Sequence, residues 1–154
     1  MLAPVCRTST RERIDFARLG VDASSHVREF RLGRVLNVHF RAGEWGSRRC
    51  GSVITTVVTG RSRYCTIEKF LAVREKLFAR VEWLSPPTYP YAPNRLVVRV
   101  RRIAPAQQRR LSCVLSLDDI QPCTVAVLPE ADGVHFLMMR DKGTDRLAGD
   151  PNRN

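Results

Sequence analysis

The chain has 154 residues, of which 44% are hydrophobic, and it carries a formal net charge of +11 at pH 7. This hydrophobic fraction can supply a core, which argues against wholesale disorder, and the length fits one domain with ragged ends. No run approaches the ~20 apolar residues that a membrane-spanning helix needs, and the N-terminus lacks the apolar region of a secretory signal.

Arginine supplies most of the positive charge, because only Lys69, Lys76 and Lys142 of the 26 basic residues are lysines. Its planar fork of donors suits phosphate, so this charge favours nucleic acid or another polyanion as the ligand. A genome rich in G·C pairs also encodes arginine in place of lysine, so basic residues spread over a surface need no ligand. Five cysteines without a secretion signal predict reduced thiols in an intracellular protein, and they leave a nuclear location open.

The N-terminal residues 1–26 are expected to be weakly structured, because few sizeable apolar residues interrupt their polar composition. A short helix over Arg11–Leu19 would have only a narrow apolar face. A single β-rich domain is then expected over residues 27–140, followed by a polar tail over residues 141–154.

The first strand signals surround a glycine-rich loop. Val35–Phe40 predicts a strand, and Trp45 in the following loop is expected to cap the core, because large aromatic side chains are mostly buried. Ser52–Val58 is the clearest strand, since it is dense in β-branched residues. Thr59–Ser62 then predicts a turn, and Arg63–Leu71 returns as its hairpin partner.

The segment Thr66–Leu84 fits two structures. Its apolar residues fall partly at helical spacing, but Arg74 lies in the middle of the proposed apolar face. Ala79, Val81 and Trp83 alternate with polar residues as in a strand. We prefer two strands joined by a turn near Arg74–Lys76.

The rest of the chain alternates between turns and strands. Ser85–Asn94 holds four prolines, so it is expected to be an extended loop that carries Tyr89 and Tyr91. Further strands are predicted at Leu96–Ile103, Leu111–Leu117, Cys123–Leu128 and Val134–Arg140, with turns at Pro105–Arg110, Asp118–Pro122 and Glu130–Gly133. The predicted fold is mainly β, either a small barrel or a strongly bent antiparallel sheet with little helix.

Three pieces of sequence, GRSRYCTIEKFL, FARVEWLSPPTYP and LSLDDIQPCTV, follow one another in this order. Their order resembles the bromo-adjacent homology domain, a β-rich module of chromatin proteins. It is also similar to the small barrel domains at the C-terminal ends of some eukaryotic DNA-transposon proteins. The resemblance covers about residues 50–128, and it implies a hairpin over Cys65–Leu84, which is the reason for preferring strands to a helix there.

The candidate binding residues are basic and aromatic. The densest group of arginines, expected to contact nucleic acid, comprises Arg99, Arg101, Arg102, Arg109 and Arg110. Tyr64, Tyr89 and Tyr91 are candidate aromatic contacts, either in a cage with Trp83 for a methylated ammonium or in a stacking platform beside the arginines. The interpretation favoured over the cage places Trp83 in the core and uses the tyrosines to hold the proline loop.

No catalytic or metal-binding motif stands out. Asp118 and Asp119 are more typical of a turn or cap than of a metal site, and the cysteines and histidines lack zinc-ligand spacing. A nucleophilic pair such as Cys50 with His39 is weaker than the alternative of buried structural cysteines. The sequence therefore predicts a non-catalytic basic module that binds nucleic acid or chromatin, derived from a mobile-element protein, without a metal or cofactor. The alternatives are a protein–protein interaction scaffold and, less favoured, a cysteine-dependent enzyme.

Overall fold

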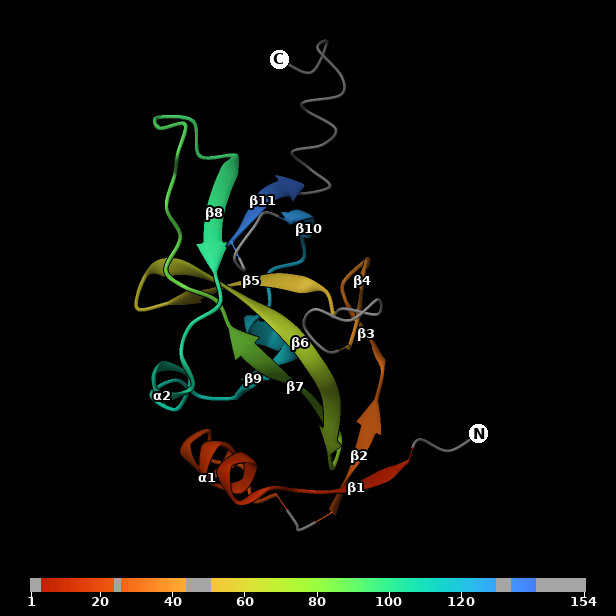
Figure 1. Ribbon diagram of the computed structural model, residues 1–154. Helices are drawn as coiled ribbons and strands as arrows, with labels where there is room; N and C mark the ends of the chain where they lie inside the picture. Colours follow the sequence, from red (N-terminus) through yellow and green to blue (C-terminus); the bar gives the residue numbers. More distant parts are fainter. Residues whose placement is uncertain (1–3, 24–25, 44–50, 130–133, 141–154) are drawn as a thin grey trace.

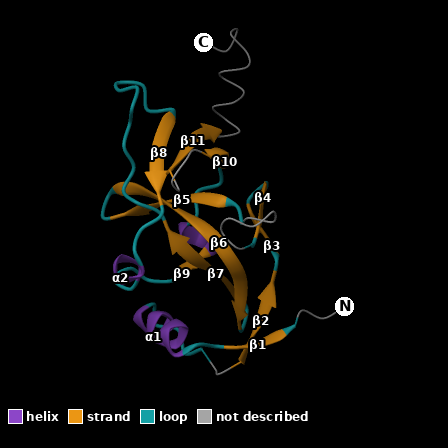
Figure 2. Ribbon diagram, viewed as in Figure 1, coloured by secondary structure: helices purple, strands orange, loops and turns teal. Residues whose placement is uncertain are grey.

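The structure is a computed structural model that describes residues 4–23, 26–43, 51–129 and 134–140. It is mainly β, with 51% of residues in strands and 14% in helices, as Figure 2 shows by colour. The described strands form a strongly bent antiparallel sheet that is not closed into a barrel, which confirms the predicted fold class. No helix among these residues has the length and apolar character to cross a membrane.

The elements follow one another along the chain as Figure 1 labels them. They are β1 (Val5–Arg7), α1 (Thr10–Arg18), β2 (His26–Phe30), β3 (Leu32–Val35), β4 (Val38–Arg41), β5 (Val53–Val58), β6 (Arg61–Val73), β7 (Lys76–Trp83), β8 (Val97–Arg101), α2 (Pro105–Gln108), β9 (Val114–Ser116), the 3-10 helix η1 (Leu117–Asp119), β10 (Thr124–Pro129) and β11 (Val134–Arg140).

The main sheet is built around β6, the long central strand in Figure 1. The strand order is β1-β2-β6-β7-β9, and β5 also pairs with β6. β5 pairs with the first half of β6 and β2 with the second half, while β7 pairs along the other edge. A bulge between Ile67 and Lys69 shifts the register of β6 against β7. Two smaller sheets, β10-β11-β8 and β3-β4, complete the fold.

The hairpins predicted from the strongest strand signals are present. Thr59 and Gly60 join β5 to β6. Both residues have positive φ, as in the tight turns of two-residue β-hairpin loops. Thr66–Leu84 forms two paired strands joined at Arg74 and Glu75, so the hairpin prediction is confirmed and the helical alternative is wrong. The strand predicted over Leu96–Ile103 is also confirmed, as β8.

The strand predicted over Val35–Phe40 is wrong in one respect. The chain turns at Leu36, whose φ is 53°, so that β3 and β4 form a hairpin of two short strands. Val38 and Phe40 then point into the core, and this packing sets the turn although no glycine or proline marks it. Asn37, in the second position of this turn, is the residue type that gives a local signal for it.

Other boundaries differ from the sequence predictions by a few residues. The basic turn predicted at Pro105–Arg110 contains the short helix α2, and the strand predicted over Leu111–Leu117 is shortened to β9. Asp118 and Asp119 lie in the turn formed by η1, as predicted. Trp45, the turn predicted at Glu130–Gly133 and the tail over residues 141–154 lie outside the described residues.

The N-terminal segment, which was expected to be weakly structured, holds β1 and α1 where the structure describes it. The helix expected near Arg11–Leu19 is confirmed, and Ser9 and Glu12 cap it through reciprocal hydrogen bonds. Phe16 is fully buried, and its ring meets Phe78 edge-on with the centroids 5.0 Å apart. Glu12 and Asp15 are buried beside Phe16, so the face of α1 that packs on the sheet is partly acidic rather than purely apolar.

Two buried carboxylates hold α1 against the sheet. The Glu12 Oε2 accepts a hydrogen bond from Arg80 Nη1 at 2.7 Å and lies 3.3 Å from Lys69 Nζ. The Asp15 Oδ2 accepts a hydrogen bond from the backbone N–H of Cys113 at 2.9 Å. These contacts link α1 to β6, to β7 and to the segment that leads into β9.

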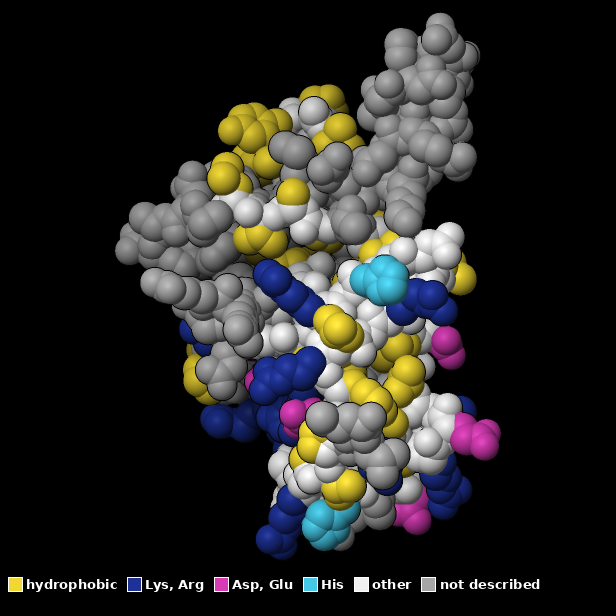
Figure 3. Space-filling model, turned by 90° about the vertical axis from the view of Figure 1, so that its right-hand side faces the viewer, with side chains coloured by type: hydrophobic (Ala, Val, Ile, Leu, Met, Phe, Trp, Pro, Cys, Tyr) yellow, Lys and Arg dark blue, Asp and Glu magenta, His cyan; other side chains and the backbone are white. Residues whose placement is uncertain are grey.

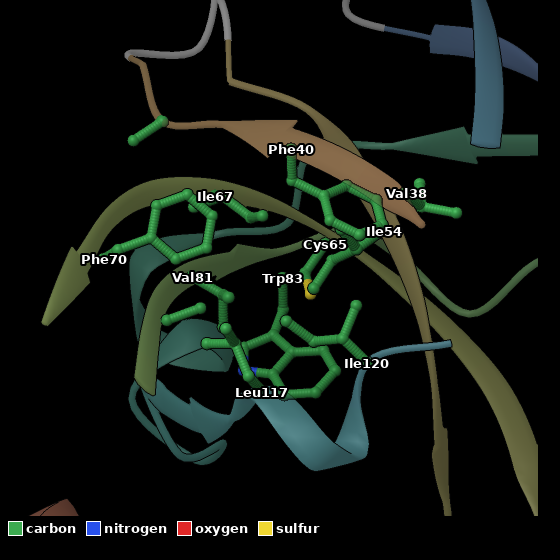
Figure 4. Close-up of a cluster of buried hydrophobic side chains, with 12 residues drawn as sticks. Val38, Phe40, Ile54, Cys65, Ile67, Phe70, Val81, Trp83, Leu117 and Ile120 are labelled. Carbon is green, nitrogen blue, oxygen red and sulfur yellow. The ribbon is translucent and has the colours of Figure 1, made fainter. Parts of the chain in front are cut away.

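Three clusters of buried side chains form the core. The first lies between the main sheet, the β3–β4 hairpin and η1, and Figure 4 shows Trp83 at its centre among Cys65, Leu117 and Ile120. The Trp83 indole Nε1 donates to the Ser112 carbonyl at 2.7 Å. The second cluster lies under α1, and the third lies between Tyr64, Leu84 and β8. The prediction that Trp83 belongs to the core is confirmed.

We expect Trp83→Ala to reduce the free energy of unfolding by about 3–5 kcal/mol, because the truncation leaves a cavity and an unpaired carbonyl. Tyr91→Ala serves as the control, since Tyr91 is 61% exposed, and a change within about 0.5 kcal/mol is expected. Denaturant melts of both variants measure the difference. A neutral Trp83→Ala would contradict the assigned packing.

The second stability prediction concerns Glu12. Burial opposes its ionisation, but hydrogen bonds from the Ser9 N–H and Arg80, with the charges of Arg80 and Lys69, outweigh it and lower its pKa. A lowered folded-state pKa gives stability that is present above the unfolded value and is lost as the pH falls through the folded value.

We therefore expect Glu12→Gln to destabilise the protein at pH 7 by about 2 kcal/mol, less than for a fully buried pair because Arg80 is partly exposed. The difference from the unmodified chain should shrink as the pH falls below about 4, near the usual pKa of a glutamate. Urea melts across this range test it, with the exposed Glu75→Gln as the control. A difference independent of pH would show that packing, not charge, holds α1.

Candidate functional site

A cleft lies between the β5–β6 turn and the proline-rich loop that follows β7, the two loops at the left of Figure 1. Its volume is about 850 Å³. We call it the arginine cleft, and its lining residues are Val58, Thr59, Gly60, Arg61, Ser62, Arg63, Tyr64, Pro86, Pro87, Tyr89 and Arg95. None of these described lining residues is acidic.

Backbone hydrogen bonds fix the two walls of the cleft relative to each other. The Leu84 N–H donates to the Tyr64 carbonyl at 2.9 Å, which ties the start of the loop to β6. Further along the loop, Thr88 and Arg99 exchange two backbone hydrogen bonds of 3.1 and 2.9 Å. The loop is thereby held against β8, and the cleft is formed by the fold itself.

Arg63 lies in the wall that β6 contributes. Its Nη2 donates to the Leu84 carbonyl at 3.0 Å, and its Cζ lies 5.7 Å from the centroid of the Trp83 ring. Its Nε is buried without an acceptor among the described residues, and burial lowers the pKa of its guanidinium. The protein alone therefore leaves part of this group unsatisfied.

Arg95 and Tyr89 form a stacked pair on the opposite wall. The Arg95 Cζ lies 4.1 Å from the centroid of the Tyr89 ring, which is cation–π geometry. Tyr89 is half-buried and packs on the cluster that contains Tyr64. The guanidinium of Arg95 is exposed, so its outer plane faces away from the ring and is accessible.

Tyr64 forms the floor of the cleft. It is only 3% exposed, and burial raises the pKa of its hydroxyl to about 12. Its ring therefore supports the walls and offers little surface to a ligand. Of the three candidate tyrosines, Tyr89 is the one with an accessible stacking partner, while Tyr91 does not line the cleft although it is exposed.

The charge of the cleft is not compensated by nearby acids. Five basic residues elsewhere pair with carboxylates, namely Arg11, Arg18, Lys69, Arg80 and Arg102. Within the described part of the chain, Arg61, Arg63 and Arg95 form no such ion pair. Three arginines therefore line one cleft without a carboxylate partner among the described residues, an arrangement that suits an anion.

The structure does not gather the arginines that the sequence singled out into one site. Arg99 and Arg101 are exposed on one face of β8, and Arg102 pairs with Glu82 at 2.8 Å. Arg109 and Arg110 follow α2, at the lower left of Figure 1. None of the five lines the arginine cleft.

Basic side chains do not form a single patch on the face that Figure 3 shows. On the face that Figure 3 shows, Lys and Arg side chains lie dispersed among hydrophobic and acidic ones. The cleft arginines are distinguished by lining one cleft together rather than by density along the chain. Arg61 and Arg63 alternate in the sequence Gly60-Arg-Ser-Arg63 directly after a turn, which is a signal for them that sequence reasoning passed over. Arg95 had no such signal.

The aromatic cage considered for Trp83 and the tyrosines is wrong. Trp83 is 2% exposed and belongs to the first core cluster, whereas Tyr64 belongs to the third. No cluster of three or more histidine, cysteine, aspartate or glutamate residues that could hold a metal occurs in the described ranges. Cys50, the candidate partner of His39, lies outside those ranges.

Comparisons with known proteins add no assignment, since no family model, curated protein or solved structure matches this chain. The resemblance to bromo-adjacent homology domains therefore stays a prediction.

The buried cysteines yield a third prediction. Cys65, Cys113 and Cys123 are free thiols that are 6% exposed or less. Burial raises the pKa of Cys65, and burial together with Asp15 raises that of Cys113 to about 12. Because the thiolate is the reactive form, we expect all three to resist iodoacetamide in the native state. Peptide mapping by mass spectrometry separates them from Cys50, with urea-unfolded protein as the control. Rapid alkylation of Cys65 or Cys113 would contradict this and revive the enzyme alternative.

Proposed function

We propose that this chain is a non-catalytic module that binds nucleic acid, free or packaged in chromatin, through the arginine cleft. The observation that carries the proposal is that Arg61, Arg63 and Arg95 line one cleft and that none of them pairs with a carboxylate of the described residues. The net charge of +11 supports it, since the long-range field of the chain attracts polyanions.

The lining of the cleft favours binding over catalysis. It holds no histidine, cysteine, aspartate or glutamate, which are the side chains that most often transfer protons near neutral pH. The hydroxyls of Thr59 and Ser62 have no base beside them within that lining, so neither is set up as a nucleophile. Guanidinium, tyrosine and proline side chains bind and position a ligand.

The order of sequence motifs gives the proposal a biological setting. The resemblance to bromo-adjacent homology domains and to the C-terminal domains of transposon proteins favours a ligand in chromatin or in mobile-element DNA. Both settings supply the phosphate groups that the cleft would contact.

An interaction scaffold is the second candidate, and one observation favours it. Leu32 and Leu36, in the β3–β4 hairpin, are each 74% exposed. Single exposed leucines are common on protein surfaces, so this observation is weaker than three arginines that line one cleft. A scaffold whose arginine content is a genomic bias would not bind nucleic acid in a salt-dependent way.

A salt titration tests the proposal. The logarithm of the affinity for nucleic acid should fall linearly with the logarithm of the salt concentration, with a slope of about −0.7 to −0.9 per phosphate contact. The double variant Arg61→Gln/Arg95→Gln should flatten that slope by about 0.7–1.5 and weaken binding at low salt, because two positive charges are removed from the cleft. The matched control is Arg109→Gln/Arg110→Gln, which removes the same charge elsewhere.

Two results would overturn the proposal. Absence of binding at low ionic strength removes nucleic acid as the ligand and leaves the scaffold. A loss that is larger in the Arg109/Arg110 variant than in the cleft variant moves the site away from the cleft, to the arginines that the sequence singled out. Thermal melts of both variants show whether each is folded.

A further inference from the structure

The shape of the arginine cleft restricts the kind of nucleic acid that fits it. Its volume of about 850 Å³ lies within the range of about 300–1,000 Å³ that is typical of sites for single small molecules. A duplex presents a broad convex surface, with its bases stacked inside and its phosphates on the outside. A recess of this size admits one unstacked nucleotide but not the width of a double helix.

The two walls of the cleft carry different kinds of side chain. Arg61 and Arg63 lie on the β6 side and present guanidinium groups suited to phosphate oxygens. The stacked pair of Tyr89 and Arg95 lies on the loop side, beside Pro86 and Pro87. A planar guanidinium already held on an aromatic ring is a surface on which a base stacks.

The cleft has few groups that would distinguish one base from another. Apart from the arginines, its side-chain hydrogen-bonding groups are the hydroxyls of Thr59, Ser62, Tyr64 and Tyr89, and it contains no asparagine or glutamine. Stacking is tolerant of sequence, since every base has a π face. Recognition in this cleft would therefore depend on strandedness more than on sequence.

We propose that the arginine cleft binds a single-stranded segment of nucleic acid, with one base stacked on the outer plane of Arg95 and the adjoining phosphates held by Arg61 and Arg63. This inference rests on the proposed function and narrows it. A phosphorylated peptide is the competing ligand, because it would use the same arginines. It would gain nothing from the Tyr89–Arg95 stack, which is the reason for preferring a nucleotide.

The experiment compares one labelled oligonucleotide of about 12 nucleotides, a length typical of single-strand sites, as a single strand and as a duplex. Fluorescence anisotropy is measured with the full chain at equal salt. A phosphoserine peptide of equal charge is the third probe. We expect the single strand to bind about ten-fold more tightly than the duplex and the peptide, in line with the contribution of one stacked base.

Arg95→Lys is the informative variant, because it keeps the positive charge and removes the planar guanidinium group on which a base would stack. It should weaken single-strand binding about five- to ten-fold with an unchanged salt slope, and leave the weaker duplex binding unaltered. Arg74→Lys is the matched control, since Arg74 is exposed in the β6–β7 turn and outside the cleft. Both positions are exposed, so both variants are expected to fold.

The outcomes separate this inference from the proposed function. Equal affinity for single strand and duplex overturns the single-strand inference and leaves nucleic-acid binding intact. The same holds if the Arg95→Lys variant binds the single strand as tightly as the Arg74→Lys variant does. Tighter binding of the phosphoserine peptide than of either oligonucleotide assigns the cleft to a phosphoprotein and overturns both. Failure to bind any oligonucleotide at low salt also overturns both.

Discussion

The pairing of one strand with three others is the constraint on which this fold depends. β6 pairs with β5 along its first half and with β2 along its second half, while β7 covers the opposite edge. A regular strand would place Ile67 and Phe70 on opposite faces, because side chains alternate with a period of two. The bulge between Ile67 and Lys69 restores them to one face, so both pack in the first core cluster while Leu71 packs in the second. With Tyr64 in the third cluster, this one strand contributes to all three core clusters.

The same strand divides the basic residues into two populations. At one end of the sheet, Lys69 and Arg80 surround the buried Glu12 and hold α1 in place. Their positive charges pair with Glu12 and stabilise the fold, since a buried carboxylate must be paired. At the other end, Arg61 and Arg63 have no carboxylate partner in the described structure and line the cleft. Formal charge counts both groups alike, although the first is already paired with a carboxylate and the second is not.

Sequence reasoning succeeded where local pattern decides the structure and failed where packing does. The β-branched run at Ser52–Val58 and the alternation of Val81 and Trp83 each predict the observed strands, because β-branched composition and period-two alternation are local signals. The burial of Glu12 is not predictable from the N-terminal sequence, because it depends on Lys69 and Arg80 in strands far along the chain. The cleft could not be predicted for a similar reason: Arg95 joins Arg61 only because the loop after Leu84 folds back onto β6. Density of arginine along the chain, as at Arg99–Arg102, does not give density in space.

The cleft is fixed before any ligand arrives, and this affects how it would bind. Its loop wall is held by backbone hydrogen bonds to β6 and β8, and its other wall ends in the tight turn at Thr59 and Gly60. Two of the three arginines are also placed in advance, since Arg63 is bonded to the Leu84 carbonyl and Arg95 lies on Tyr89. An arginine side chain that is already ordered loses little rotamer entropy on binding, whereas a free one loses up to about 2 kcal/mol. The contacts of Arg63 and Arg95 therefore reduce the entropy that these two side chains would lose, so more of their electrostatic attraction can contribute to affinity.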